Sequence, residues 1–139
     1  MILLDTSGRL AAIDESQRAH AECSRVLKAA PGPLLLSPFV LAELDYLLGR
    51  YVGAAAQAAL LDDVGRGAYR LEGFWAADVV RAAEVIERFA DLKIGLADAS
   101  LVVLAERYGV SRILTLDVRH FAVLRIGARK RFNVVPAGP

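Results

Sequence analysis

The chain has 139 residues, which is enough for one packed core and too few for two. Its composition, 55% hydrophobic and 24% charged with a formal net charge of +1, excludes an intrinsically disordered chain. The longest run without an acidic or basic residue covers residues 29–42 and contains three prolines. A membrane-spanning helix needs about 20 apolar residues, so we expect no membrane segment.

The N-terminus and the cysteine content indicate where the protein works. The opening MILLDTS has no basic segment and carries Asp5 inside its apolar stretch, so it lacks the pattern of a secretory signal peptide. Cys23 is the only cysteine, which excludes an intrachain disulfide and a zinc site built from thiolates. We therefore expect a cytoplasmic protein with one domain over residues 1–139.

The first part of the chain alternates strand and helix patterns. Met1–Leu4 is a short apolar run that predicts a strand, and Asp5-Thr6-Ser7-Gly8 after it predicts the start of a helix. Residues 16–30 have helical character and end at Pro31-Gly32-Pro33. The apolar run Leu34–Leu36 then predicts a second strand.

Ser37 and Pro38 predict the start of the next helix, as its N-cap and its first residue. One face of this helix is apolar at the i, i+4, i+7 and i+8 positions Val40, Leu44, Leu47 and Leu48. These leucines offer more apolar surface than one face of a sheet needs, which is compatible with a contact between two copies of the chain.

The rest of the chain continues the alternation. Helices are predicted at about 54–64, 75–90 and 97–108, the last ending at Gly109, and strands at 68–71, 113–116 and 132–135. The strands are apolar at successive positions and are separated by helices, which is typical of a parallel sheet covered on both faces. We predict an α/β fold, a three-layer α/β/α sandwich around a four- to five-stranded, mainly parallel sheet.

Four acidic residues stand in positions where a core element would not need them. Asp5 and Asp117 follow predicted strands, and Glu43 and Asp98 lie in apolar helical segments. Each aspartate has an alternative role as the N-cap of a helix. Glu43 lies beyond capping range and has no Lys or Arg three or four residues away. Burying its carboxylate toward an apolar face would cost several kcal/mol unless it is compensated.

Carboxylates drawn to one end of a sheet repel one another, and a divalent cation relieves this repulsion. Oxygen ligands favour hard ions, so Mg²⁺ or Mn²⁺ is the expected cofactor. Thr115 lies two residues before Asp117, on the same side of the strand, where its hydroxyl could support the metal or a water bound to it. The spacing from Asp117 to His120 is too weak a pattern to predict a ligand.

The order of these motifs resembles the PIN-domain ribonucleases, and more narrowly the VapC toxins of bacterial toxin–antitoxin pairs. The resemblance covers the whole chain and rests on Asp5-Thr6-Ser7, Ala42-Glu43-Leu44, Leu96-Ala97-Asp98-Ala99 and Thr115-Leu116-Asp117 followed by Arg119-His120-Phe121. It implies a metal-dependent endoribonuclease that inhibits translation by cutting a transfer or ribosomal RNA, leaving a 5′-phosphate and a 3′-hydroxyl.

The resemblance also implies roles and partners. The metal-binding acids would be Asp5, Glu43, Asp98 and Asp117, with Thr6, Ser7 and Thr115 as supporting polar groups. The partners would be a VapB-type antitoxin, whose C-terminal segment fills the acidic pocket, and a second copy of the toxin, in larger complexes with the antitoxin. One position departs from the family, because Arg9 stands where apolar residues are usual. Arg9 either competes for the charge of Asp5 or faces solvent.

Basic residues gather near the C-terminus. Residues 107–131 hold seven basic residues and one acid, a net charge of +6, while the rest of the chain carries −5. The candidates for binding RNA phosphates are Arg119, Arg125, Arg129, Lys130 and Arg131. The alternative is a set of solvated side chains without a binding role.

Other α/β functions lack their signatures. The chain has no G-x-x-x-x-G-K-[ST] motif for nucleotide phosphates, no well-placed lysine for a receiver domain, and Ser7 where a haloacid-dehalogenase-type phosphatase has its second Asp. One alternative from another class stays open, a PIN-fold binding module without catalytic activity.

Overall fold

The computed structural model describes residues 1–137, so residues 138 and 139 of the expected 1–139 domain lie outside it. A five-stranded sheet has the order β3-β2-β1-β4-β7, and every neighbouring pair is parallel. Its strands are β1 (Ile2–Leu4), β2 (Leu34–Leu36), β3 (Arg70–Leu71), β4 (Arg112–Leu114) and β7 (Asn133–Val135). The predicted parallel sheet is therefore confirmed.

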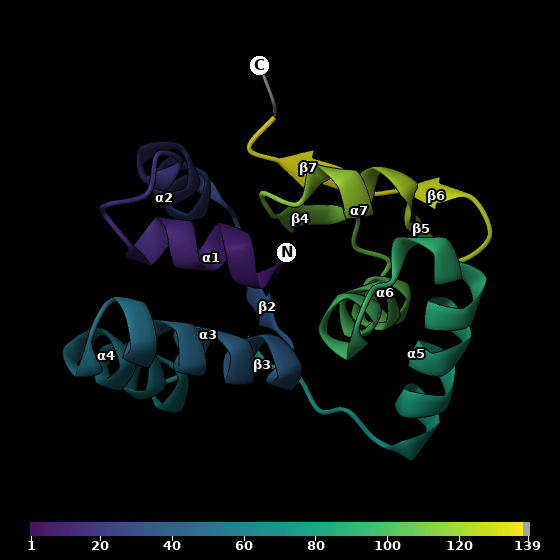
Figure 1. Cartoon of the computed structure of the whole chain (residues 1–139), viewed down its shortest axis with the longest axis horizontal. Coiled ribbons are helices and arrows are strands. Elements are labelled where there is room, and N and C mark those ends of the chain that lie inside the picture. The colour runs from purple at the N-terminus through teal and green to yellow at the C-terminus, as the bar shows by residue number, and fades with distance from the viewer. Residues whose placement is uncertain (138–139) are drawn as a thin grey trace.

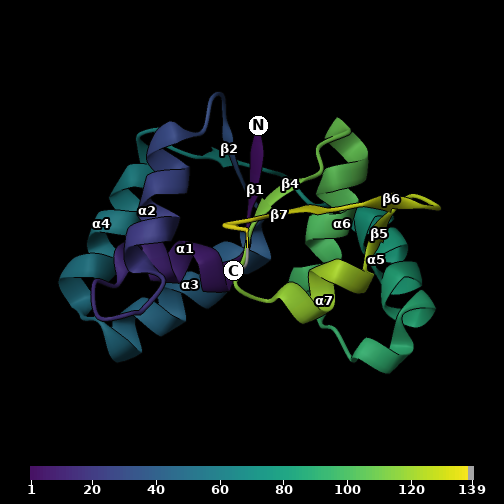
Figure 2. The same ribbon diagram turned by 90° about the horizontal axis from the view of Figure 1, so that it is seen from above.

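Helices cover both faces of this sheet, as the two views show (Figures 1 and 2). On one side lie α1 (Thr6–Ile13), α2 (His20–Ala29), α3 (Pro38–Tyr51) and α4 (Ala54–Gly65). On the other lie α5 (Ala76–Arg88), α6 (Leu96–Tyr108) and the short α7 (Val118–Val123), with a 3₁₀ turn at Ala90–Leu92. The three-layer α/β/α architecture is confirmed.

The core lies where the sheet meets its helices. All three residues of β1 are fully buried, and so are Ile113 and Leu114 of β4. Seven consecutive residues of α6, from Ala99 to Ala105, are buried, because α6 lies between the sheet and α5. Leu44 and Leu48 of α3 are also fully buried within this chain, so they are not surface for a contact between copies.

Some predicted boundaries are wrong, for local reasons. The helix expected from residue 16 begins at His20, because the Asp14 carboxylate accepts bonds from the backbone and hydroxyl of Ser16 and so holds a turn. The helix expected over 75–90 ends at Arg88, and Trp75 precedes it as the N-cap. The strand expected over 113–116 ends at Leu114.

The sequence patterns gave no bounds for two small elements near the C-terminus. One is α7, and the other is an antiparallel hairpin of β5 (Arg125–Ile126) and β6 (Lys130–Arg131), which lies beside α5 and α6 (Figure 1). Strands of two residues are too short to show a periodic pattern. In residues 1–137, no helix combines the length and the apolar character that crossing a membrane requires.

Gly8 allows α1 to lie directly on β4. A Cβ atom at this position would lie 2.6 Å from the carbonyl oxygen of Leu114. The helix therefore approaches the strand more closely than any residue with a side chain allows. This contact brings Ser7 within hydrogen-bond distance of the backbone beyond β4, where its hydroxyl accepts a bond from the N–H of Leu116 at 2.9 Å.

Candidate functional site

The four acids meet at the carboxyl end of the sheet. The ends of β1 and β4 are neighbours there, and the first turns of α3 and α6 begin at the same edge. They enclose a hollow of about 430 Å³, lined by Asp5, Thr6, Ser7, Leu10, Gln17, Glu43, Leu47, Asp98, Leu116 and Asp117. The fold thus brings together residues that are up to 112 positions apart in the sequence.

Asp5 lies at the base of this hollow and is almost fully buried. Its Oδ1 accepts a bond from the N–H of Thr6 at 2.8 Å, so it also caps α1. Its Oδ2 accepts bonds from the hydroxyls of Thr115 at 2.5 Å and Ser7 at 3.2 Å. Burial raises the pKa of Asp5 to about 6; Asp98 contributes in the same direction, while the bond from Thr115 opposes the rise.

Glu43 reaches the hollow from α3 and is exposed, so the expected burial against an apolar face is wrong. The buried face of α3 passes through Leu44 and Leu48, and Glu43 lies beside that face and not on it. The hydroxyl of Thr6 donates a bond to Oε1 of Glu43 at 2.5 Å. Because the N–H of Thr6 also donates to Asp5, Thr6 links the second acid to the first.

Asp98 lies in the first turn of α6, whose N-cap is Gly95, so the capping alternative is wrong for Asp98. For Asp117 that alternative holds together with its place in the hollow, because its Oδ1 accepts a bond from the N–H of His120 at 3.2 Å. Burial raises the pKa of Asp98, and the charges of Asp117 and Glu43 act in the same direction, while His120 opposes the rise.

His120 belongs to this cluster, although its spacing from Asp117 is too weak a pattern to predict a ligand. Its Nδ1 lies 2.8 Å from Oδ2 of Asp117 and 3.0 Å from Oδ2 of Asp98. The available signal was the three-residue spacing from Asp117, which places both side chains at the start of α7. That spacing does not show that Asp98 approaches His120 from α6.

A buried pair of serines was also missed. The hydroxyls of Ser37 and Ser100 lie 2.7 Å apart, and both residues are fully buried. Ser37 caps α3 by accepting a bond from Phe39, and Ser100 donates to the carbonyl of Ala97 in α6. The pair joins the starts of the two helices that carry Glu43 and Asp98.

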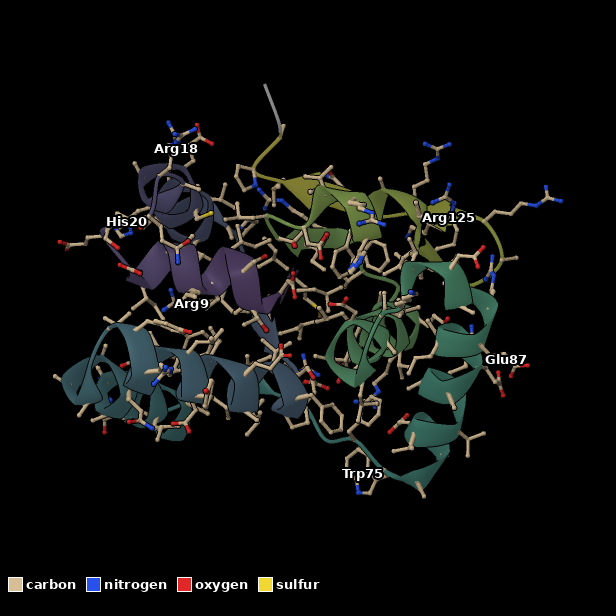
Figure 3. The ribbon with its side chains drawn as sticks, viewed as in Figure 1. Arg9, Arg18, His20, Trp75, Glu87 and Arg125 are labelled. Carbon is tan, nitrogen blue, oxygen red and sulfur yellow. The ribbon has the colours of Figure 1, made fainter. Side chains whose placement is uncertain are left out.

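Arg9 is not among the residues that line the acidic hollow. Its Nε donates a bond to the hydroxyl of Tyr69 at 2.6 Å, and its guanidinium lies 5.4 Å from the centre of that ring. Figure 3 shows Arg9 between α1 and the α3–α4 side of the molecule. It therefore neither competes for Asp5 nor points freely into solvent.

The basic residues near the C-terminus differ in what they contact. Nη1 of Arg125 donates to the carbonyl oxygens of residues 122, 123 and 124, so this side chain holds the end of α7. Arg119 on α7, and Arg129, Lys130 and Arg131 on the hairpin, are exposed. Their role in binding RNA stays a prediction.

The donor set of the hollow fits a divalent cation. Four carboxylates provide hard oxygen ligands, and the raised pKa values of Asp5 and Asp98 reflect burial and mutual repulsion that a cation would relieve. The hydroxyls of Thr6, Ser7 and Thr115 already bond to the acids or lie beside them, so they orient the carboxylates.

Comparisons with known proteins find relatives over nearly the whole chain. The family model for the PIN domain matches residues 2–126. The chain is 42% identical over 135 residues to ribonuclease VapC26 of Mycobacterium tuberculosis, covering 97% of this chain and all of that protein.

Solved structures share the fold. Mycobacterium tuberculosis VapC20, described as a toxin that cleaves the sarcin-ricin loop, has a TM-score of 0.78 at 24% identity, covering 84% of this chain and 90% of that one. The VapBC2 complex of Rickettsia felis, bound to a DNA fragment from its promoter, has a TM-score of 0.68 at 19% identity, covering 96% and 98%.

Proposed function

This chain belongs to the PIN-domain family, and we propose that it is a VapC-type endoribonuclease that depends on a divalent metal. The observation that carries the proposal is the convergence of Asp5, Glu43, Asp98 and Asp117 on one hollow. The reaction is hydrolysis of an RNA phosphodiester bond, in which water attacks phosphorus and the bond to the 3′ oxygen breaks. The products then carry a 5′-phosphate and a 3′-hydroxyl.

The four carboxylates hold the metal, for which Mg²⁺ or Mn²⁺ is the natural choice of an oxygen-rich donor set. A bound divalent ion supplies a Lewis acid at the phosphate and lowers the pKa of a water molecule. Asp5 presents an ionised carboxylate above pH 6, in an orientation set by Thr115 and Ser7. Thr6 fixes one oxygen of Glu43, which leaves the other for the cation or for water.

Basic side chains beyond the hollow bind the RNA backbone in this proposal. Arg119 follows Asp117 by two residues, and the hairpin residues Arg129, Lys130 and Arg131 follow α7 in the chain. Selection of RNA over DNA then comes from 2′-hydroxyl contacts and splayed bases in a loop of the substrate. Arg125 is a weaker candidate for this role, because its Nη1 bonds backbone carbonyls at the end of α7.

The partner that we infer is a VapB-type antitoxin. An acidic hollow of this kind suits a basic side chain, and a second hollow beside it, lined by Thr6, Ala42, Glu43, Tyr46 and Leu47, suits an apolar one. We propose that the chain works as one nuclease domain in the cytoplasm and that it pairs with a second copy, as its family does.

The test is cleavage of a total RNA preparation by the purified chain, with Mg²⁺, Mn²⁺ or EDTA, alongside Asp5→Asn. We expect discrete fragments with either metal and none with EDTA or with the variant. Mapping the fragment ends identifies the target and shows whether they carry 5′-phosphates.

Two outcomes contradict the proposal. Cleavage that persists in EDTA, or that Asp5→Asn performs at the rate of the unmodified chain, overturns the metal mechanism. If the chain binds RNA but cuts neither total RNA nor intact ribosomes and transfer RNA, the inactive binding module is the correct description.

A further inference from the structure

The nitrogen of one imidazole ring lies between two carboxylates. Nδ1 of His120 is 2.8 Å from Asp117 and 3.0 Å from Asp98, and the two acids come from different helices. The three donor atoms all lie within 4.8 Å of one another. The side chains of His120 and Asp98 are 21% and 19% exposed and that of Asp117 is 36% exposed, so the cluster is partly shielded from water.

A single hydrogen on Nδ1 does not serve both carboxylates equally. A neutral ring that carries its hydrogen on Nδ1 donates one good bond, and the second oxygen then lies at contact distance without a proton of its own. Two negative charges thus face one nitrogen at a point where an added cation would interact favourably with all three groups.

The same distances suit ligands on neighbouring corners of one metal ion. Ligand atoms about 2.1 Å from an octahedral ion, at right angles to each other, lie about 3 Å apart. With the hydrogen on Nε2, Nδ1 turns a lone pair toward the space that the carboxylates share.

The other two acids are held differently. Oδ2 of Asp5 accepts bonds from the hydroxyls of Thr115 and Ser7, and Oε1 of Glu43 accepts one from Thr6. The hollow therefore has one side whose acids are oriented by hydroxyls and another side with the carboxylates of Asp98 and Asp117. The imidazole of His120 lies against these two carboxylates, and together the three side chains offer a mixed oxygen and nitrogen donor set.

We propose that His120 is a direct metal ligand through Nδ1, sharing one ion with Asp98 and Asp117. This inference rests on the proposed metal-dependent function and adds a ligand to it. Nitrogen donors suit transition metals better than Mg²⁺, which prefers oxygen. His120 therefore makes the site favour Mn²⁺ over Mg²⁺.

The first experiment identifies the ligand by spectroscopy, without measuring cleavage. Mn²⁺ is bound to the chain, prepared without a polyhistidine tag, and electron spin-echo modulation is recorded. We expect nuclear modulation from a bound imidazole nitrogen, which changes when histidine is labelled with ¹⁵N. The chain has only two histidines, and His20 lies on α2 with its Nδ1 bonded to the carbonyl of Ala11, so the assignment is direct.

The second experiment compares affinities for Mn²⁺ and Mg²⁺ in His120→Phe, with His20→Phe as the matched control. A ligand role predicts that His120→Phe loses at least about tenfold in Mn²⁺ affinity and much less in Mg²⁺ affinity. A ring that only donates a hydrogen bond to the acids orients the same oxygen ligands for either ion. Its removal would then lower the affinities for Mn²⁺ and Mg²⁺ by a similar factor.

Each outcome decides the question. Imidazole modulation that His20→Phe keeps and His120→Phe loses supports the proposal. Bound Mn²⁺ without nitrogen modulation in the unmodified chain overturns it and leaves the metal-dependent nuclease intact. If Mn²⁺ does not bind at all, both the ligand assignment and the metal mechanism fail. His120→Gln provides a second measurement if His120→Phe does not fold.

Discussion

Asp5 combines a functional position with a cost in stability. The carboxylate is nearly buried, and its pKa in the folded chain is about 6, above the ordinary value of 3.8. A folded-state pKa above the unfolded one means that this group contributes stability below about pH 4, and that the contribution is lost as the pH rises through 6. The difference corresponds to roughly 3 kcal/mol at pH 7 in the absence of metal.

We predict that Asp5→Asn raises the stability of the metal-free chain at pH 7.5 by about 1–2 kcal/mol, which is several degrees in melting temperature. The gain is smaller than the full cost of the charge, because the amide does not accept all the bonds that Thr6, Ser7 and Thr115 donate. Thermal unfolding in EDTA measures it.

The pH dependence provides the control for this prediction. The advantage of Asp5→Asn is expected to disappear near pH 4, where Asp5 is protonated in the folded chain. Addition of Mn²⁺ at pH 7.5 is expected to stabilise the unmodified chain more than the variant, since only the unmodified chain keeps all four acids. A variant that is less stable than the unmodified chain at pH 7.5 would show that burial does not dominate at Asp5.

At the scale of elements, the contact between α1 and β4 determines how Ser7 reaches the site. We predict that Gly8→Ala destabilises the chain by about 2 kcal/mol or more, because the added Cβ meets the backbone of Leu114 at 2.6 Å and the strand lacks room to move. Cleavage is expected to fall with stability, since α1 carries Thr6 and Ser7. Denaturant unfolding measures the free energy.

Gly65→Ala is the matched control, at the last residue of α4. No atom lies within 4 Å of a Cβ built there, and its backbone does not have a positive φ. Alanine is the better helix former, so this variant is expected to be stabilised by up to about 1 kcal/mol. Equal effects of the two substitutions would refute the close approach of α1 to β4.

The sequence predicted those parts of the site that depend on order along the chain. Asp5 and Asp117 follow strands, and parallel neighbours end at the same edge, so their meeting follows from the topology. The meeting of Asp98 with His120, and the pair of Ser37 and Ser100, depend on how α6 packs against α7 and α3. Helix packing depends on side chains far apart in the sequence, and no local spacing encodes it.

Glu43 shows a limit of predicting burial from a helical pattern. Its place in the hollow was predicted, but the reason given for it was wrong, because the side chain is exposed and was expected to face the core. A helical pattern indicates which residues are buried to within about one position, and Glu43 stands next to the buried Leu44. The carboxylate is thus on the rim of the core, where Thr6 reaches it.

Over the whole molecule, two groups of three exposed cations lie at separate ends. The hairpin end carries Arg129, Lys130 and Arg131, while α2 and the turn before it carry Arg18, Arg25 and Lys28. Figure 3 shows Arg18 and Arg125, which mark these two ends, on opposite sides of the sheet. Neutralising either set removes three positive charges, so the two sets form a matched pair for locating the path of the RNA.

We predict that replacing Arg129, Lys130 and Arg131 together by Gln weakens RNA binding and lowers its salt dependence, while Arg18, Arg25 and Lys28 replaced by Gln have little effect. Each phosphate contact contributes about 0.7 to 0.9 to the slope of log affinity against log salt, so three lost contacts lower the slope by about 2. Binding of the catalytically silent Asp5→Asn chain to RNA, titrated between about 50 and 200 mM salt, measures both slopes.

Because these side chains lie outside the acidic hollow, Mn²⁺ affinity should stay unchanged in both triple variants. A larger change of slope in the α2 set would place the RNA on the opposite side of the molecule and leave the metal site as described.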